Sequence, residues 1–135
     1  MQLNTELYKR ILEQAKNNPR LRQAMDLRTT TEDNSQRMLN ALIPGTQIPI
    51  HRHTTTSETS VILYGSIDEI FYDIDGNELV RYTLHVGDGL QIPVGQFHTI
   101  EVKEPSILLE IKDGAYSPAK QEDIINTRHC ISTTL

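Results

Sequence analysis

The sequence has one cysteine, no tryptophan and no long apolar run. Because Cys130 has no second cysteine to pair with, an internal disulfide is excluded and we expect a reducing compartment, the cytoplasm. The longest apolar run in the middle of the chain covers residues 61–64, whereas a membrane span needs about 18 apolar residues. The amino terminus enters an amphipathic pattern directly, so we expect no secretory signal and no membrane partner.

The 135 residues carry a net charge of −5. Proteins that grip duplex nucleic acid neutralise phosphates with a basic surface, so this charge argues against a nucleic-acid partner. With 37% hydrophobic and 23% charged residues, the composition is ordinary for a globular protein and excludes disorder, collagen and coiled coil. The length fits a single domain with its own core.

The first part of the chain shows helical spacing. Apolar residues recur every three or four positions from Leu3 to Ala15, which predicts an amphipathic helix. Asn18 and Pro19 are a good N-cap and a good first helical residue, so they predict a second, short helix over residues 19–25.

From residue 36 onward the pattern changes to short strands with frequent glycine and proline corners. The expected strands cover residues 37–43, 60–64, 66–74, 78–84, 89–92, 97–103 and 106–112. Asp75-Gly76-Asn77 predicts a hairpin between two of them. Many short strands with such corners favour a small barrel or sandwich. We therefore expect one domain made of a helical lead-in (residues 1–35), a barrel (36–114) and a tail (115–135).

Three histidines and one glutamate form a constellation typical of a metal site. His51 and His53 are one residue apart, so an extended strand would project both from the same face. Glu58 follows a short polar stretch, and His98 follows a corner that contains Pro93 and Gly95. Imidazole donors suit Zn, Fe, Ni or Cu, and the carboxylate also admits Mn.

The glycines around these residues make the pattern specific. The first stretch reads Gly45-x5-His51-x-His53-x4-Glu58-x6-Gly65, and the second reads Gly87-x5-Pro93-x-Gly95-x2-His98. Both resemble the two conserved motifs of the cupin superfamily, and the 21 residues between them lie within its usual range. The asparagine that often ends the second motif is replaced by Val102; it is not a ligand, so the metal-binding set stays intact.

This resemblance implies an all-β fold, a double-stranded β-helix jelly-roll barrel preceded by a short N-terminal helical lead-in. It also implies one divalent transition metal per chain (Zn, Fe, Mn or Ni) held by His51, His53, Glu58 and His98. Further segments, which together cover most of residues 5–120, look closest to the WbuC-like cupin-fold metalloproteins. Such proteins are often encoded among bacterial surface-polysaccharide genes.

Five other polar residues are candidates for the surroundings of the metal or for the pocket: Asn40, Tyr64, Glu110, Lys112 and Tyr116. Strand alternation places Asn40 on the face opposite Leu39. Glu110 and Lys112 share one face, which points either to the pocket or to solvent. The two tyrosines either gate the barrel mouth or pack on its rim.

Three chemistries fit such a metal site: Lewis-acid isomerase, epimerase or lyase activity on a sugar or nucleotide-sugar, Fe(II) dioxygenation, and hydrolysis. The polysaccharide link favours the first. The rival hypotheses are a non-catalytic module that binds a metal or a small molecule, and a metal that only stabilises the barrel. We expect a small-molecule ligand, which the polysaccharide link suggests is a carbohydrate, and a homodimer that pairs through residues 1–43.

Overall fold

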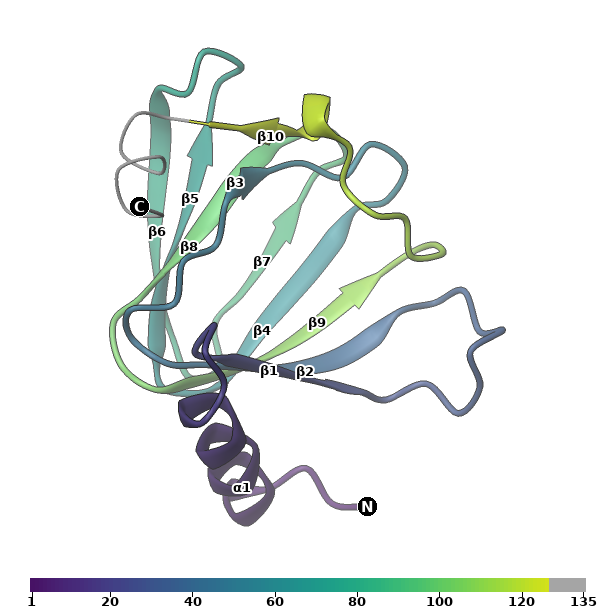
Figure 1. The fold of residues 1–135 in the computed structure, drawn as a ribbon, viewed down its shortest axis with the longest axis vertical. Coiled ribbons are helices and arrows are strands. Elements are labelled where there is room, and N and C mark those ends of the chain that lie inside the picture. The colour runs from purple at the N-terminus through teal and green to yellow at the C-terminus, as the bar shows by residue number, and fades with distance from the viewer. Residues whose placement is uncertain (127–135) are drawn as a thin grey trace.

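The computed structural model describes residues 1–126, so Cys130 lies outside the described part. Two five-stranded antiparallel sheets face each other, in the orders β1-β2-β9-β4-β7 and β10-β3-β8-β5-β6 (Figure 1). The elements are α1 (Thr5–Lys16), β1 (Arg22–Asp26), β2 (Arg37–Leu42), β3 (Ile50–His51), β4 (Glu58–Tyr64), β5 (Ser66–Tyr72), β6 (Glu78–His85), β7 (Gly89–Ile92), β8 (Phe97–Val102), β9 (Ser106–Lys112), the 3-10 helix η1 (Gln121–Asp123) and β10 (Ile124–Ile125). The predicted all-β jelly roll with a short N-terminal helix is confirmed.

Helix α1 covers the outer face of the first sheet. The side chain of Asn4 caps it by accepting a hydrogen bond from the backbone N–H of Leu7 at 3.0 Å, which satisfies one of the free donors of the first turn. Its apolar stripe packs on the outward residues Leu39, Ala41 and Ile107 of β2 and β9. This contact buries the outer face of β2 and leaves the alternate residues of that strand, including Asn40, to the inner face.

The second helix predicted over residues 19–25 is wrong, because Arg22–Asp26 forms strand β1. β1 pairs antiparallel with β2, with Arg22 opposite Leu42. Leu21 adopts a φ of 57°, which interrupts a helix before it can propagate. Pairing also satisfies backbone groups along an edge of β2 that a helix would leave unpaired.

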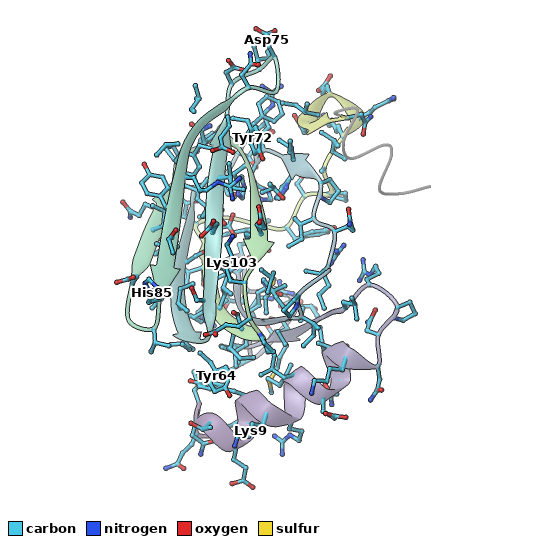
Figure 2. All side chains as sticks on the ribbon, turned by 90° about the vertical axis from the view of Figure 1, so that its left-hand side faces the viewer. Lys9, Tyr64, Tyr72, Asp75, His85 and Lys103 are labelled. Atoms are coloured by element: carbon cyan, nitrogen blue, oxygen red, sulfur yellow. The ribbon has the colours of Figure 1, made fainter. Side chains whose placement is uncertain are left out.

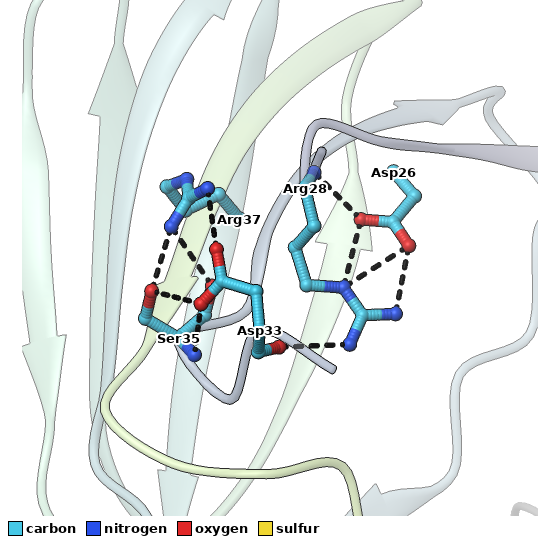
Figure 3. Close-up of polar contacts among 5 residues, drawn as sticks. All are labelled: Asp26, Arg28, Asp33, Ser35 and Arg37. Carbon is cyan, nitrogen blue, oxygen red and sulfur yellow. Dashed lines mark hydrogen bonds and ion pairs between the residues drawn. The ribbon is translucent and has the colours of Figure 1, made fainter. Parts of the chain in front are cut away.

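A polar network orders the connection between β1 and β2 (Figure 3). Arg28 forms a bidentate pair with Asp26, with its shortest contact 2.8 Å. Arg37 donates to Asp33 at 2.9 Å, and the backbone N–H of Ser35 donates to the same carboxylate at 2.9 Å. These contacts lower the pKa of Asp33 to about 2, chiefly through the bonds from Ser35 and Arg37.

The two sheets meet over an apolar core at one end of the barrel. This core is formed by Leu42, Ile62, Ile67, Leu84 and Leu108. Along β8, Val102 lies opposite Ile67 beside this core, whereas His98 lies opposite Phe71 toward the other end. The polar inner residues are therefore gathered at the end of the barrel away from the core.

The hairpin predicted at Gly76 is confirmed, and the motif residue Gly65 also lies in a turn. Strands β5 and β6 form the expected hairpin around Gly76, with Asp75 at its tip (Figure 2). Gly65 joins β4 to β5 with a φ of 81°, and a Cβ there would clash with the backbone of Pro105 and Ser106, so this motif position requires glycine. No helix within residues 1–126 is both long and apolar enough to cross a bilayer.

Candidate metal centre

Three imidazoles converge on the inner face of the second sheet. His51 ends β3 and is the cross-strand partner of His98 in β8, and His53 follows two residues later. The ring centroids of His51 and His98 are 4.4 Å apart, and that of His53 lies 5.1 and 5.9 Å from them. One nitrogen from each ring lies within 4.8 Å of the other two. The three histidines thus form a candidate metal site.

Glu58 faces this cluster from the first sheet. One of its oxygens, Oε2, lies 3.7 Å from Nε2 of His53 and 3.7 Å from Nε2 of His98. Among the described residues, both Glu58 Oε2 and His98 Nε2 are buried without a hydrogen-bond partner. Buried polar atoms without partners are rare and costly. A divalent transition metal that accepts nitrogen and carboxylate donors would satisfy both atoms, so the residues present fit such an ion.

The opposite ring nitrogens of two histidines are already engaged. Nδ1 of His51 lies 2.8 Å from the carbonyl oxygen of Pro49. Nδ1 of His98 lies 2.7 Å from a carboxyl oxygen of Glu69, a buried residue of β5. Where these nitrogens carry the hydrogen, Nε2 of each ring is left with a lone pair, which is the usual arrangement around metal-binding histidines.

Glu69 was not among the predicted site residues. It lies between Ile67 and Phe71 on the inward side of β5, where strand alternation predicts an apolar residue. A glutamate in such a position requires a polar partner inside the barrel. That signal was available in the sequence, but it did not identify His98 as the partner.

Burial keeps the imidazoles neutral. It lowers the pKa of His51 and of His98 to about 4, and that of His53 to about 3. The nearby Lys112 acts in the same direction on all three. Burial also raises the pKa of Glu58 well above its usual range, helped by the neighbouring carboxyl of Glu110. Neutral imidazoles keep the lone pairs that a metal requires.

A cavity of about 320 Å³ adjoins the histidines and Glu58. Asn40, Glu110 and Lys112 line it from β2 and β9. Lys112 is the cross-strand neighbour of Glu58. Asn40, Glu110 and Lys112 therefore belong to the same inner face as Glu58. A second cavity, of about 110 Å³, lies next to it and shares His53 and Lys112 as lining residues.

The two candidate tyrosines lie elsewhere. Tyr64 packs edge-to-face against Tyr8 of α1 with ring centroids 6.5 Å apart, and Figure 2 shows it beside the helix. Tyr116 is exposed and lines the smaller cavity. Neither lines the cavity at the histidines.

Arg52 fastens the segment that carries His51 and His53. Its Nε donates to a carboxylate oxygen of Asp123 at 3.1 Å, and its guanidinium lies 4.7 Å from the ring centroid of Phe97. Its backbone N–H also donates to the carbonyl oxygen of Asp123 at 3.0 Å. The described part of the C-terminal region therefore braces the histidine segment. Arg52 and Asp123 were not among the residues predicted to shape the site.

Solved structures of cupins share this fold. CapF from Staphylococcus aureus, described as a capsular polysaccharide assembling protein, aligns with 80% of this chain and 32% of its own, at 22% identity and a TM-score of 0.64. An oxalate oxidase in complex with glycolate aligns with 76% of this chain and 56% of its own, at 18% identity and a TM-score of 0.61. The cupin domain of Schizosaccharomyces pombe Cnp3 aligns with 69% of this chain and 64% of its own, at 15% identity and a TM-score of 0.58.

The chain thus spans about a third of CapF and just over half of the oxalate oxidase. At these identities the likeness establishes the cupin fold. No curated protein matches the sequence. Residues 3–84, more than half of the chain, match the family described as a domain of unknown function (DUF6016), and the chain belongs to that family.

Proposed function

We propose that this protein is a metal-dependent cupin of the WbuC-like group that isomerises, epimerises or cleaves a sugar or nucleotide-sugar in bacterial surface-polysaccharide biosynthesis. The observation that carries the proposal is the pair of buried, unpartnered atoms, Glu58 Oε2 and His98 Nε2, at the wall of a cavity. His51, His53, Glu58 and His98 would hold one divalent ion (Zn, Fe, Mn or Ni). Such an ion, when bound, supplies a Lewis acid for a carbonyl or hydroxyl oxygen.

The chain itself supplies groups that can handle protons. Glu110 and Lys112 both line the cavity, so a carboxyl oxygen can accept a proton from a bound molecule and an ammonium can donate a hydrogen bond to it. The apolar side chains of Leu42, Ile48 and Ile100 line the same cavity and limit the water that reaches it. Acid–base chemistry on a carbon next to a carbonyl needs these elements together.

The polysaccharide context has two supports. One is the resemblance of residues 5–120 to WbuC-like proteins, and the other is the similarity in fold to CapF, itself described as assembling capsular polysaccharide. Neither names the substrate.

The test is hydrogen exchange at carbon. Metal-loaded protein is incubated in D₂O with sugar phosphates and nucleotide-sugars, and proton NMR follows the loss of C–H signals. We expect exchange or product with one compound class, and its loss in Glu110→Gln with metal content unchanged. Binding without exchange or product would favour the non-catalytic module. Oxygen uptake by an iron-loaded sample would favour the dioxygenase.

We further propose a homodimer that pairs through residues 1–43 and acts in the cytoplasm, with residues 1–35, 36–114 and 115–135 as lead-in, barrel and tail of one domain. Small cupins commonly pair through strands, and β1 is an edge strand of the first sheet. Sedimentation at micromolar concentration should give twice the chain mass. A 15.4 kDa species would contradict the dimer.

A further inference from the structure

Lys112, the last residue of β9, lines both the cavity at the histidines and the smaller cavity next to it. It is half-buried, and within the described residues its Nζ takes part in no hydrogen bond or ion pair. Other cations of the barrel are engaged: Arg81 contacts three carboxylates, and Lys103 contacts two. The ammonium group of Lys112 is therefore available to a ligand in the cavity that this residue lines.

The charges around Lys112 favour an anionic ligand. Arg22 also lines the cavity, where its Nη1 donates to the carbonyl oxygen of Gln47 at 2.8 Å. The two cations balance the carboxylates of Glu58 and Glu110, so a divalent ion at the histidines would leave the cavity positive.

The size of the cavity restricts the ligand. About 320 Å³ lies at the lower end of the range of roughly 300–1,000 Å³ that is usual for ligand pockets. A monosaccharide-sized molecule fits such a space, whereas the nucleotide part of a nucleotide-sugar would have to lie outside it. Asn40 and Glu110 offer hydrogen bonds to hydroxyl groups in the same cavity.

We propose that the cavity binds a monosaccharide-sized polyhydroxy compound that carries an oxyanion, either a carboxylate or a phosphate ester. Lys112 Nζ holds the oxyanion, and a hydroxyl or carbonyl oxygen of the compound faces His51, His53 and His98. This inference rests on the proposed function, since it places the ligand against the same site.

The experiment compares charged and neutral probes of similar size. Zinc-loaded protein, its metal content measured by elemental analysis, is titrated calorimetrically with D-gluconate, D-glucose 6-phosphate and D-glucitol. The variant Lys112→Met removes the charge and keeps most of the stem. The matched control is Lys120→Met, because Lys120 lines the smaller cavity and not the cavity at the histidines.

We expect gluconate or glucose 6-phosphate to bind at least about tenfold more tightly than glucitol, in keeping with a hydrogen bond to a charged group. Lys112→Met should lose about tenfold for that probe, with no change for glucitol and unchanged zinc content, and Lys120→Met should behave like wild type. The charged probe that binds more tightly identifies the oxyanion.

Equal affinity for charged and neutral probes, no binding of either charged probe, or wild-type affinity in Lys112→Met would overturn the inference. The experiment separates failure of this inference from failure of the proposed function. Protein that takes up no zinc but binds an anion through Lys112 contradicts the metal centre alone. Protein that holds zinc but shows no dependence on Lys112 contradicts the ligand class alone.

Discussion

Two adjacent carboxylates on β5 have different partners and opposite pKa shifts on the outer and inner faces of the barrel. Asp68 and Glu69 are 3% and 2% exposed, and strand alternation sends them to opposite faces of one sheet. Asp68 accepts hydrogen bonds from Thr83 at 2.9 Å and Arg81 at 3.1 Å. Glu69 contacts His98.

The consequence is an opposite direction of the two pKa shifts. Burial alone would raise the pKa of Asp68, but the hydrogen bonds from Thr83, Arg81 and Lys103 outweigh it and lower the value. Burial raises the pKa of Glu69, and the charge of Glu110 adds to it. The outer carboxylate lies close to the surface among cations and is held as an anion, whereas the inner one lies deep in the barrel, where burial disfavours its charged form.

The largest effect should come from the apolar part of the inner face. Ile67 is fully buried, two residues before Glu69 on the same side of β5. Ile67→Ala removes core contacts and should lower the free energy of unfolding by about 2–5 kcal/mol. Chemical denaturation measures the loss, and metal content of the folded variant should equal that of wild type. A stability loss below 1 kcal/mol would show that the inner core is less tightly packed.

The inner carboxylate should matter for the metal and the outer one should not. Glu69→Gln replaces the carboxyl group that contacts Nδ1 of His98, so we expect metal affinity to fall by about 10- to 100-fold, as is typical for partners of metal-binding histidines. Competition with a chelating dye gives the affinity. Asp68→Asn is the matched control. Similar losses of metal affinity in both variants would contradict the proposed difference between the inner and outer faces.

The outer carboxylate should matter for stability, with a defined pH dependence. Asp68→Asn should cost about 1 kcal/mol at neutral pH, because Arg81 is partly solvated and its contribution is screened. The folded pKa of Asp68 lies below its ordinary value of 3.8. Its contribution is therefore present above that value and is lost as the pH falls through the folded pKa. Chemical denaturation of the wild type and of Asp68→Asn from pH 7 to pH 3 should show the difference in their free energies of unfolding becoming smaller as the pH falls. A constant difference would contradict this role of the Asp68 charge.

The smallest effect belongs to the rim of the same outer cluster. Glu101 accepts from Arg81 at 2.9 Å, but its side chain is 54% exposed. Exposed ion pairs contribute little, so Glu101→Gln should change the free energy of unfolding by no more than about 0.5 kcal/mol. Thermal melts of Glu101→Gln and Asp68→Asn compare the stability losses of the two variants. A larger loss in Glu101→Gln would show that exposure does not determine how much each carboxylate contributes.

The sequence predicted the parts of the fold and site that depend on local spacing. The motif glycines, including Gly65 with its positive φ, and the hairpin at Gly76 follow from backbone conformations that only few residues tolerate. The convergence of His51, His53 and His98 was likewise predictable, because the motif spacing carries the topology with it. The assignment of the four ligands stays a prediction.

Interactions between distant strands could not be predicted in the same way. β1 was mistaken for a helix because its strand state depends on the edge of β2, a tertiary effect that local propensity does not contain. The contact between Glu69 and His98 spans 29 residues of sequence. Whether Lys112 faces solvent or the cavity depends equally on how the two sheets close over each other.

The central claim is that His51, His53, Glu58 and His98 bind one metal ion. Elemental analysis of untagged protein purified without chelator, beside the double variant His51→Ala/His98→Ala, tests it most directly. We predict about one equivalent of Fe, Mn, Ni or Zn in the wild type, as for a single four-ligand site, and none in the variant. Equal metal in both proteins, or none in either after reconstitution, would contradict the claim.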